Sequence, residues 1–267
     1  MQSKLTDNYY PTLLQAFGLF AFFIFINVLA ALASSVTIAK FFNQSINLFI
    51  TYTITFSITI IFGIVQKKDD PRDNGLFSFS PVPLKIYPIL VVLTLAILTL
   101  VDPITDLIPM PDFFYKMFLE LLTDKSYSTF FMMVIAAPVL EEILFRGIFL
   151  NGFLKNYSPR RSLIWSSLFF AVAHMNPWQF IVAFILGLVI GYVYMKTKSL
   201  LPCIFIHFIA NLTSYSSRFL FDMEENKITT TREMVGNNLL YFSILFLCIL
   251  IVYFLIQKLT QIFRDST

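Results

Sequence analysis

Residues 138–147 read PVLEEILFRG and place two adjacent glutamates and an arginine in the middle of an apolar run. The run extends from Thr129 to Leu154, which is longer than the stretch of about 20 helical residues that spans a bilayer. Each charge at mid-membrane costs roughly 3 kcal/mol on insertion scales. A chain keeps three charges there only where they pair, face a polar cavity or take part in chemistry.

Helix geometry separates the roles of these charges. Glu142 and Arg146 lie four residues apart with the acid on the N-terminal side, which is the favourable order for an ion pair on one face. Glu141 points about 100° away from Glu142, so Arg146 cannot hold both acids in the same way. Pro138 removes a backbone donor, and membrane helices tolerate such breaks where the backbone lines a cavity. A buried ion pair that only locks helices together fits equally well, but the second glutamate favours a functional site.

The composition places most of the chain in a membrane. Of its 267 residues 57% are hydrophobic and 13% are charged, whereas soluble domains are about a quarter charged. Eight apolar segments run over Leu13–Ala39, Leu48–Val65, Ile86–Val101, Thr129–Leu154, Leu163–Met175, Phe180–Met195, Leu200–Tyr215 and Leu239–Gln257. The fifth and the seventh are short for a full span. We therefore predict one all-α membrane domain over residues 1–267, a polytopic bundle of about eight transmembrane helices.

The loops predict an orientation in the membrane. Loops on the side of the N-terminus carry 12 of the 19 Lys and Arg residues and the other side carries 6, while Arg146 lies inside a helix. This excess predicts a multi-pass protein of the cell membrane with both termini in the cytoplasm. Residues 113–122 are predicted to form an amphipathic helix on the membrane surface. No basic tract is dense enough to suggest nucleic acid as a partner.

The only two histidines of the chain, His174 and His207, both lie inside apolar runs. His207 and Asn211 are four residues apart, so one helical face presents an imidazole and an amide together. A lone membrane histidine more often bonds a neighbouring helix than acts as a catalyst. Helix rise nevertheless puts Glu141 roughly 18–20 Å, His174 roughly 16–18 Å and His207 roughly 10 Å from the cytoplasmic ends. These depths favour one polar pocket that opens towards the cytoplasm.

The residue types in this pocket indicate hydrolysis of an amide or ester bond. No serine or cysteine forms an evident triad or dyad with the histidines. A carboxylate in an apolar pocket can accept a proton from water, and a histidine can orient that water. A second histidine and an amide can donate hydrogen bonds to a developing oxyanion. The same chemistry allows Zn²⁺ as an alternative, held by Glu141, His174 and His207 with an open position for water.

Three motifs together resemble the signatures of a known family. They are Glu141-Glu142-x-x-x-Arg146, Phe170-x-x-x-His174 and His207-x-x-x-Asn211, in this order and each within an apolar segment. The set is similar to that of the CPBP family, the CAAX prenyl protease and bacteriocin-processing intramembrane endopeptidases, also called the Abi family. Any one motif is weak, but the three at this spacing are specific. They place the predicted catalytic core segment over residues 129–215.

The resemblance implies a role for each motif residue. Glu141 would be the general base and His174 its partner in activating water. His207 and Asn211 would be the oxyanion donors. The remaining pair, Glu142 and Arg146, would support them.

The family resemblance also implies a reaction and its partners. The reaction is glutamate-type cleavage of a peptide bond near the cytoplasmic membrane face, without a cofactor, with zinc dependence as the alternative. Its substrates would be prenylated CAAX-type or bacteriocin-type peptides. The partners expected are the lipid bilayer and a peptide or lipidated peptide, and no nucleic acid.

Two other classes of function stay open at this point. A non-catalytic membrane protein that binds a peptide or confers immunity predicts that Glu141→Gln keeps function, whereas a hydrolase predicts its loss. A proton-coupled transporter would also bury Glu and His residues. Transporters commonly have two related halves, and this chain shows none, so the transporter ranks below the other two.

Overall fold

The computed structural model describes residues 9–36, 42–67, 77–109, 111, 114, 124–220 and 231–265. These residues form helices and connecting segments without any strand. Most of residues 113–122, where a surface helix was predicted, lie outside the described ranges. The single helices are α1 (Leu13–Val36), α2 (Gln44–Gln66), α3 (Ile86–Thr105), α8 (Pro159–Ala173), α9 (Pro177–Thr197), α10 (Leu201–Leu220), α11 (Thr231–Val235) and α12 (Asn238–Asp265).

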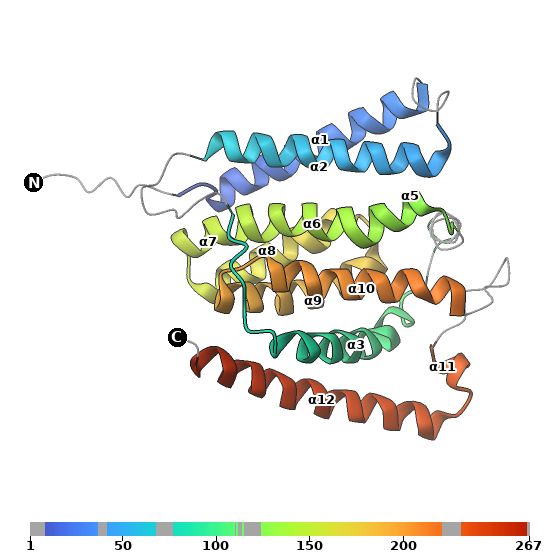
Figure 1. The fold of residues 1–267 in the computed structure, drawn as a ribbon. Coiled ribbons are helices and arrows are strands. Elements are labelled where there is room, and N and C mark those ends of the chain that lie inside the picture. The colour runs from blue at the N-terminus through green and yellow to red at the C-terminus, as the bar shows by residue number, and fades with distance from the viewer. Residues whose placement is uncertain are drawn as a thin grey trace, which may run out of the picture.

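One long composite helix carries the stretch that decides the fold. It runs without interruption from residue 127 to residue 156 and includes two wider, π-helical segments. Its parts are α5 (Tyr127–Phe130), η2 (Phe131–Ala136), α6 (Ala137–Glu142), η3 (Ile143–Leu150) and α7 (Asn151–Asn156). In Figure 1 it lies in the middle of the bundle, between the α1–α2 pair and the layer of α9 and α10.

The composite helix begins at a polar cap. The Ser126 side chain accepts a hydrogen bond from the amide of Thr129. Asp124 lies just before this cap, outside the membrane-spanning helices. Burial opposes ionisation of its carboxyl group, but hydrogen bonds from Ser45, Thr129 and Ser126 lower the pKa of Asp124 to about 2. The carboxylate of Asp124 is therefore charged at neutral pH, and the positive end of the helix dipole faces it.

The structure confirms the all-α membrane bundle. Within the described ranges, five helices are long and apolar enough to cross a membrane, namely α1, α2, α3, α9 and α12. The other three predicted segments correspond to the composite helix, α8 and α10. α8 has 15 residues and is short, as predicted, because about 20 residues are needed for a span. The seventh helix, α10, extends beyond its apolar segment, since it continues to Leu220 and has 20 residues.

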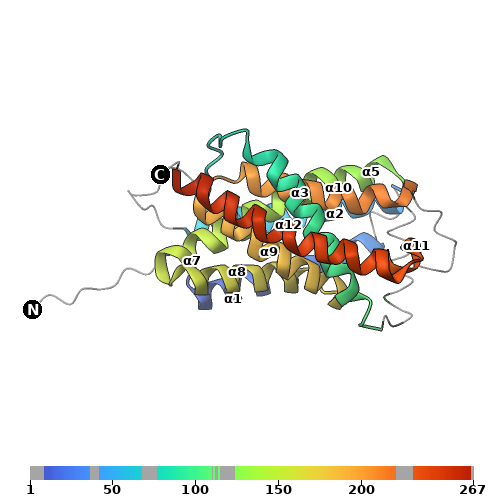
Figure 2. The ribbon, with the colours of Figure 1, turned by 90° about the horizontal axis from the view of Figure 1, so that it is seen from below.

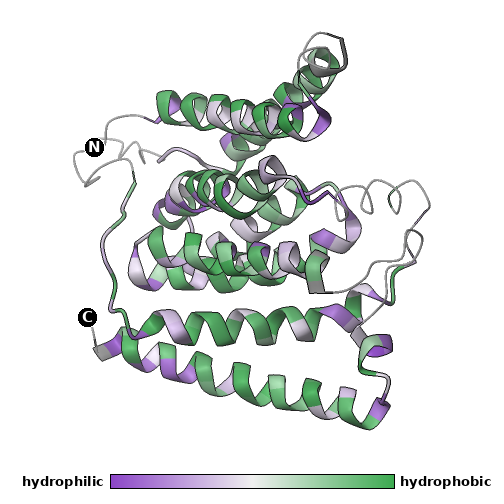
Figure 3. Ribbon diagram, turned by 45° about the vertical axis from the view of Figure 1, so that its right-hand side comes forward, coloured by the Kyte–Doolittle hydropathy of each residue, from purple (hydrophilic) through white to green (hydrophobic). Residues whose placement is uncertain are grey.

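Two apolar cores lie on opposite sides of the composite helix. One joins α3, α9, α10 and α12, with Leu93 and Ile190 almost fully buried. The other joins α1, α2, η3 and α8, with Phe145 and Phe149 at its centre. Seen from below, α12 packs on α3, which packs in turn on α9 and α10 (Figure 2). Hydrophobic residues cover the helices and hydrophilic residues gather towards their ends, as expected for a bundle in lipid (Figure 3).

Successive long helices alternate in direction along the chain (Figure 1). α1 begins and α12 ends at the same end of the bundle (Figure 1). A chain that begins and ends on the same side crosses the membrane an even number of times, and the eight predicted segments agree with this. The cytoplasmic assignment of that end stays a prediction from the Lys and Arg counts.

Candidate active site

The centre of the candidate site is the carboxylate of Glu142, which is fully buried. Its Oε1 accepts a hydrogen bond from Arg146 Nη1 at 2.8 Å and another from His207 Nδ1 at 2.9 Å. The ion pair predicted between Glu142 and Arg146 is therefore confirmed, and both side chains are 0% exposed. The contact with His207 comes from α10, and sequence spacing did not indicate it.

Arg146 ties this carboxylate to two further helices. Its Nη2 donates to the backbone carbonyl of Gly187 in α9 at 3.2 Å. Its guanidinium also lies over the ring of Phe170 in α8, 4.3 Å from the centroid. A Cβ atom at Gly187 would come within 3.1 Å of the Ser167 side chain. The glycine thus lets α8 and α9 approach closely, as small residues do where membrane helices pack.

Phe170 separates and orients the two histidines. Its ring packs edge-on against His174, with centroids 5.1 Å apart, and against His207, with centroids 5.5 Å apart. The backbone carbonyl of Phe170 also contacts His174 Nδ1 at 2.9 Å. Because a carbonyl oxygen can only accept, Nδ1 carries the proton, and Nε2 of the neutral ring is an acceptor. The motif included Phe170, but sequence reasoning had assigned it no role.

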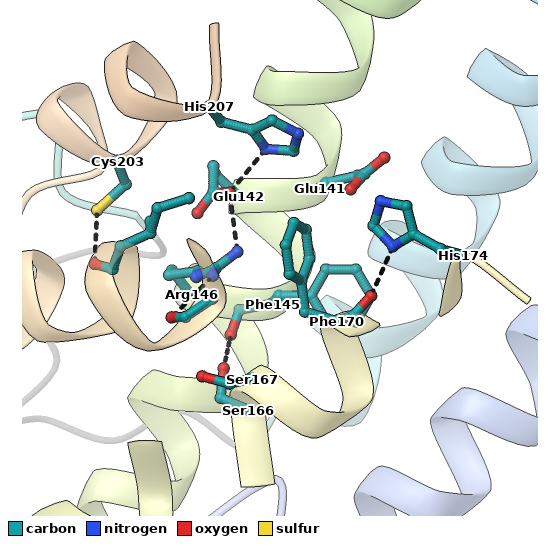
Figure 4. Close-up of polar contacts among 12 residues, drawn as sticks. Glu141, Glu142, Phe145, Arg146, Ser166, Ser167, Phe170, His174, Cys203 and His207 are labelled. Atoms are coloured by element: carbon teal, nitrogen blue, oxygen red, sulfur yellow. Dashed lines mark hydrogen bonds and ion pairs between the residues drawn. The ribbon is translucent and has the colours of Figure 1, made fainter. Parts of the chain in front are cut away.

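Glu141 projects between the two histidines. In Figure 4 its side chain and that of His174 point toward one another, while Glu142 turns towards Arg146 and His207. Glu141 is 8% exposed, and its Oε1 accepts a hydrogen bond from the hydroxyl of Tyr52 at 2.5 Å. Its Oε2 is buried and has no hydrogen-bond partner within the part of the chain that the structure describes. Tyr52 lies in α2, and no sequence motif pointed to it.

Asn211 also makes a contact that the sequence did not indicate. Its Nδ2 donates to the backbone carbonyl of Met133 in η2 at 2.7 Å. In this π-helical turn the amide of Ala137 bonds to the carbonyl of Met132, five residues earlier. The next amide in that series would be that of Pro138, which has no hydrogen to donate to Met133. Asn211 thus supplies a donor where the proline cannot, and one amide hydrogen remains for other partners.

We expect Asn211→Ala to lower both activity and stability. Loss of the bond to Met133 should cost about 0.5–1.5 kcal/mol of unfolding free energy. Loss of an oxyanion donor, the role that the family resemblance implies for Asn211, should lower kcat about 100-fold. Thermal melting and kcat of the purified variants measure the two effects.

Asn47→Ala is the matched control for this variant, since the amide of Asn47 also donates to a backbone carbonyl, that of Phe42. It should lower stability alone. An Asn211→Ala protein with wild-type kcat would restrict Asn211 to its structural contact.

The zinc alternative would use Glu141, His174 and His207. Among the residues that the structure describes, no three His, Cys, Asp or Glu side chains gather so as to hold a metal ion. Nδ1 of each histidine is engaged by a protein oxygen. Zn²⁺ stays an alternative prediction, and a chelator tests it.

One comparison with known proteins matches the segment that carries the three motifs. Residues 123–213 match the family model described as "Type II CAAX prenyl endopeptidase Rce1-like". The matched segment contains all three motifs, and it supports the CPBP (CAAX protease) family that they predict. In general terms, it supports a CAAX-type membrane endopeptidase. No curated protein and no solved structure matched the chain.

Proposed function

We propose that this chain cleaves a peptide bond with water activated by Glu141. The proposal starts from the match of residues 123–213 to the Rce1-like family of type II CAAX prenyl endopeptidases. Cleavage would take place inside the membrane, near the cytoplasmic face. The observation that carries the proposal is the hydrogen bonding of the two carboxylate oxygens of Glu141. One of its oxygens is held by Tyr52, and the other is buried without a partner among the described residues.

The first half of the reaction is attack on the peptide carbonyl. Water placed between Glu141 and His174 gives a proton to Oε2 of Glu141. Nε2 of His174, as an acceptor, holds the second hydrogen of that water and so orients it. The water oxygen bonds to the carbonyl carbon, and the carbonyl oxygen becomes an oxyanion.

The second half is collapse of the tetrahedral intermediate. The oxyanion takes hydrogen bonds from Nε2 of His207 and the remaining amide hydrogen of Asn211. Because Nδ1 of His207 already donates to Glu142, Nε2 can donate only when the ring carries both protons. The C–N bond then breaks, and Glu141 returns its proton to the leaving nitrogen. Water is consumed, and an acid and an amine are formed.

The surroundings of the site favour substrates with a hydrophobic or lipidated segment. A cavity of about 320 Å³ lies between α3, α6 and α10. Its walls are apolar and include Pro138, one turn before the two glutamates, and Phe208, next to His207. An apolar chain in this cavity would hold its attached peptide close to Glu141.

The test is cleavage by the purified full-length chain in lipid nanodiscs. A farnesylated peptide that ends in a CAAX sequence is compared with the same peptide without the farnesyl group, each with and without 1,10-phenanthroline. We expect faster cleavage of the farnesylated peptide and no inhibition by the chelator.

The other outcomes of this test separate the alternatives. Inhibition that added Zn²⁺ reverses would replace the glutamate mechanism with the metal-dependent one. Tight binding of the peptide without any cleavage would instead support a non-catalytic peptide-binding protein.

A further inference from the structure

Tyr52 contacts Glu141 from outside the three motifs. It lies in α2, 89 residues before Glu141 in the sequence, and outside the matched segment 123–213. Its hydroxyl donates to Oε1 of Glu141 at 2.5 Å. A phenol that ionises near pH 10 in water remains a donor at neutral pH. We propose that Tyr52 is a positioning residue for the general base, an inference that rests on the proposed function.

The ring of Tyr52 is held in place by its own helix and by α1. It packs against Phe56, one turn further along α2, with centroids 4.6 Å apart. Phe56 packs in turn edge-on against Phe23 of α1, with centroids 4.9 Å apart. Phe56 and Phe23 are both almost fully buried. The hydroxyl of Tyr52 is therefore presented from a rigid aromatic stack, and not from a mobile side chain.

The contact has a geometric consequence for Glu141. A carboxylate can rotate about its last bond and exchange its two oxygens. The hydrogen bond from Tyr52 fixes Oε1 on the side of α2 and leaves Oε2 for the water. Arg146 does not perform this task, because it holds Glu142 on another face of the helix. Tyr52 of α2 thus orients Glu141, as Arg146 and His207 orient Glu142.

The proposal extends the catalytic unit beyond the segment 129–215 predicted from the motifs. α2 packs on η2, α6 and η3, which carry the motif stretch. The α1–α2 pair then has a function besides spanning the membrane, since it supplies Tyr52, which orients the general base. A protein that retained residues 129–215 without α2 would lack this group.

Tyr52→Phe tests the proposal, because it removes the hydroxyl and keeps the ring stack. Displacement of a reacting group by about 1 Å can cost about 100-fold in rate. We expect kcat to fall 10- to 100-fold while KM stays at its wild-type value, and the melting temperature to fall by only the few degrees that one lost hydrogen bond costs. A Tyr52→Phe enzyme with wild-type kcat would overturn the proposal, and so would a raised KM at unchanged kcat.

Tyr192→Phe is the matched control. The hydroxyl of Tyr192 in α9 bonds to Thr260 in α12 at 2.7 Å, so it also joins two helices, but away from the site. Its loss should leave kcat and KM unchanged. A fall in kcat in this control as large as in Tyr52→Phe would show that the loss of any interhelical hydroxyl slows the enzyme, and it would also overturn the proposal.

A second readout does not depend on activity. The infrared difference between wild type and Glu141→Gln isolates the carboxylate bands of Glu141. We expect Tyr52→Phe to shift these bands and Tyr192→Phe to leave them in place. Unshifted bands would disprove the contact itself. If the bands shift but the wild-type protein cleaves no peptide, the failure lies in the proposed function and not in the contact.

Discussion

Glu141→Gln is expected to reduce peptide cleavage at least about 1,000-fold, because an amide cannot take a proton from water and general base catalysis contributes about 10²–10⁴-fold. Gln has nearly the same shape as Glu, and its carbonyl oxygen can still accept the hydrogen bond from Tyr52. The variant should therefore fold and melt like the wild type. Initial rates at saturating peptide, together with thermal melting in detergent, measure both quantities.

Asp102→Asn provides the matched control. Asp102 is a partly buried carboxyl group near the end of α3, where its side chain bonds to Thr231. Loss of its charge should not change the rate. Cleavage by Glu141→Gln at the wild-type rate would mean that another group is the base, or that a contaminating protease makes the cut.

Arg146→Leu is expected to lower the free energy of unfolding by about 3–5 kcal/mol, because removal of one partner leaves the Glu142 carboxylate buried without its counter-charge. The variant also loses the bond to Gly187 and the contact with the Phe170 ring. Reduced expression and a lower melting temperature should follow. Unfolding in increasing amounts of a denaturing detergent measures the size of the effect.

Two further variants test the cause of this loss. Arg161→Leu removes an exposed arginine that lies 4.7 Å from the Tyr157 ring centroid, and such an exposed contact is worth only about 0.5–1 kcal/mol. Glu142→Leu combined with Arg146→Leu should be more stable than Arg146→Leu alone, because no unpaired charge remains. A stable Arg146→Leu protein would show that Arg146 is not needed to neutralise Glu142.

Local sequence rules predicted the helix positions and one ion pair of this protein. Hydropathy located all eight apolar segments, since a helix in lipid must be apolar over most of its length. The spacing of Glu142 and Arg146 predicted their ion pair, because residues four apart share a helical face. The least accurate estimate is the end of the eighth segment, which the apolar pattern puts at Gln257. α12 continues to Asp265 through polar residues that a hydropathy pattern does not assign to a helix.

The sequence by itself determined the all-α membrane class, the positions of the helices and the Glu142–Arg146 pair, because each depends on residues within one or two helical turns. Only the tertiary structure decided which groups hold the two glutamates. His207 reaches Glu142 across 65 residues, and Tyr52 reaches Glu141 across 89. The bond from Asn211 to Met133 spans 78 residues. Contacts of this kind depend on how each helix is rotated and shifted against its neighbours, and the packing of the whole bundle sets both.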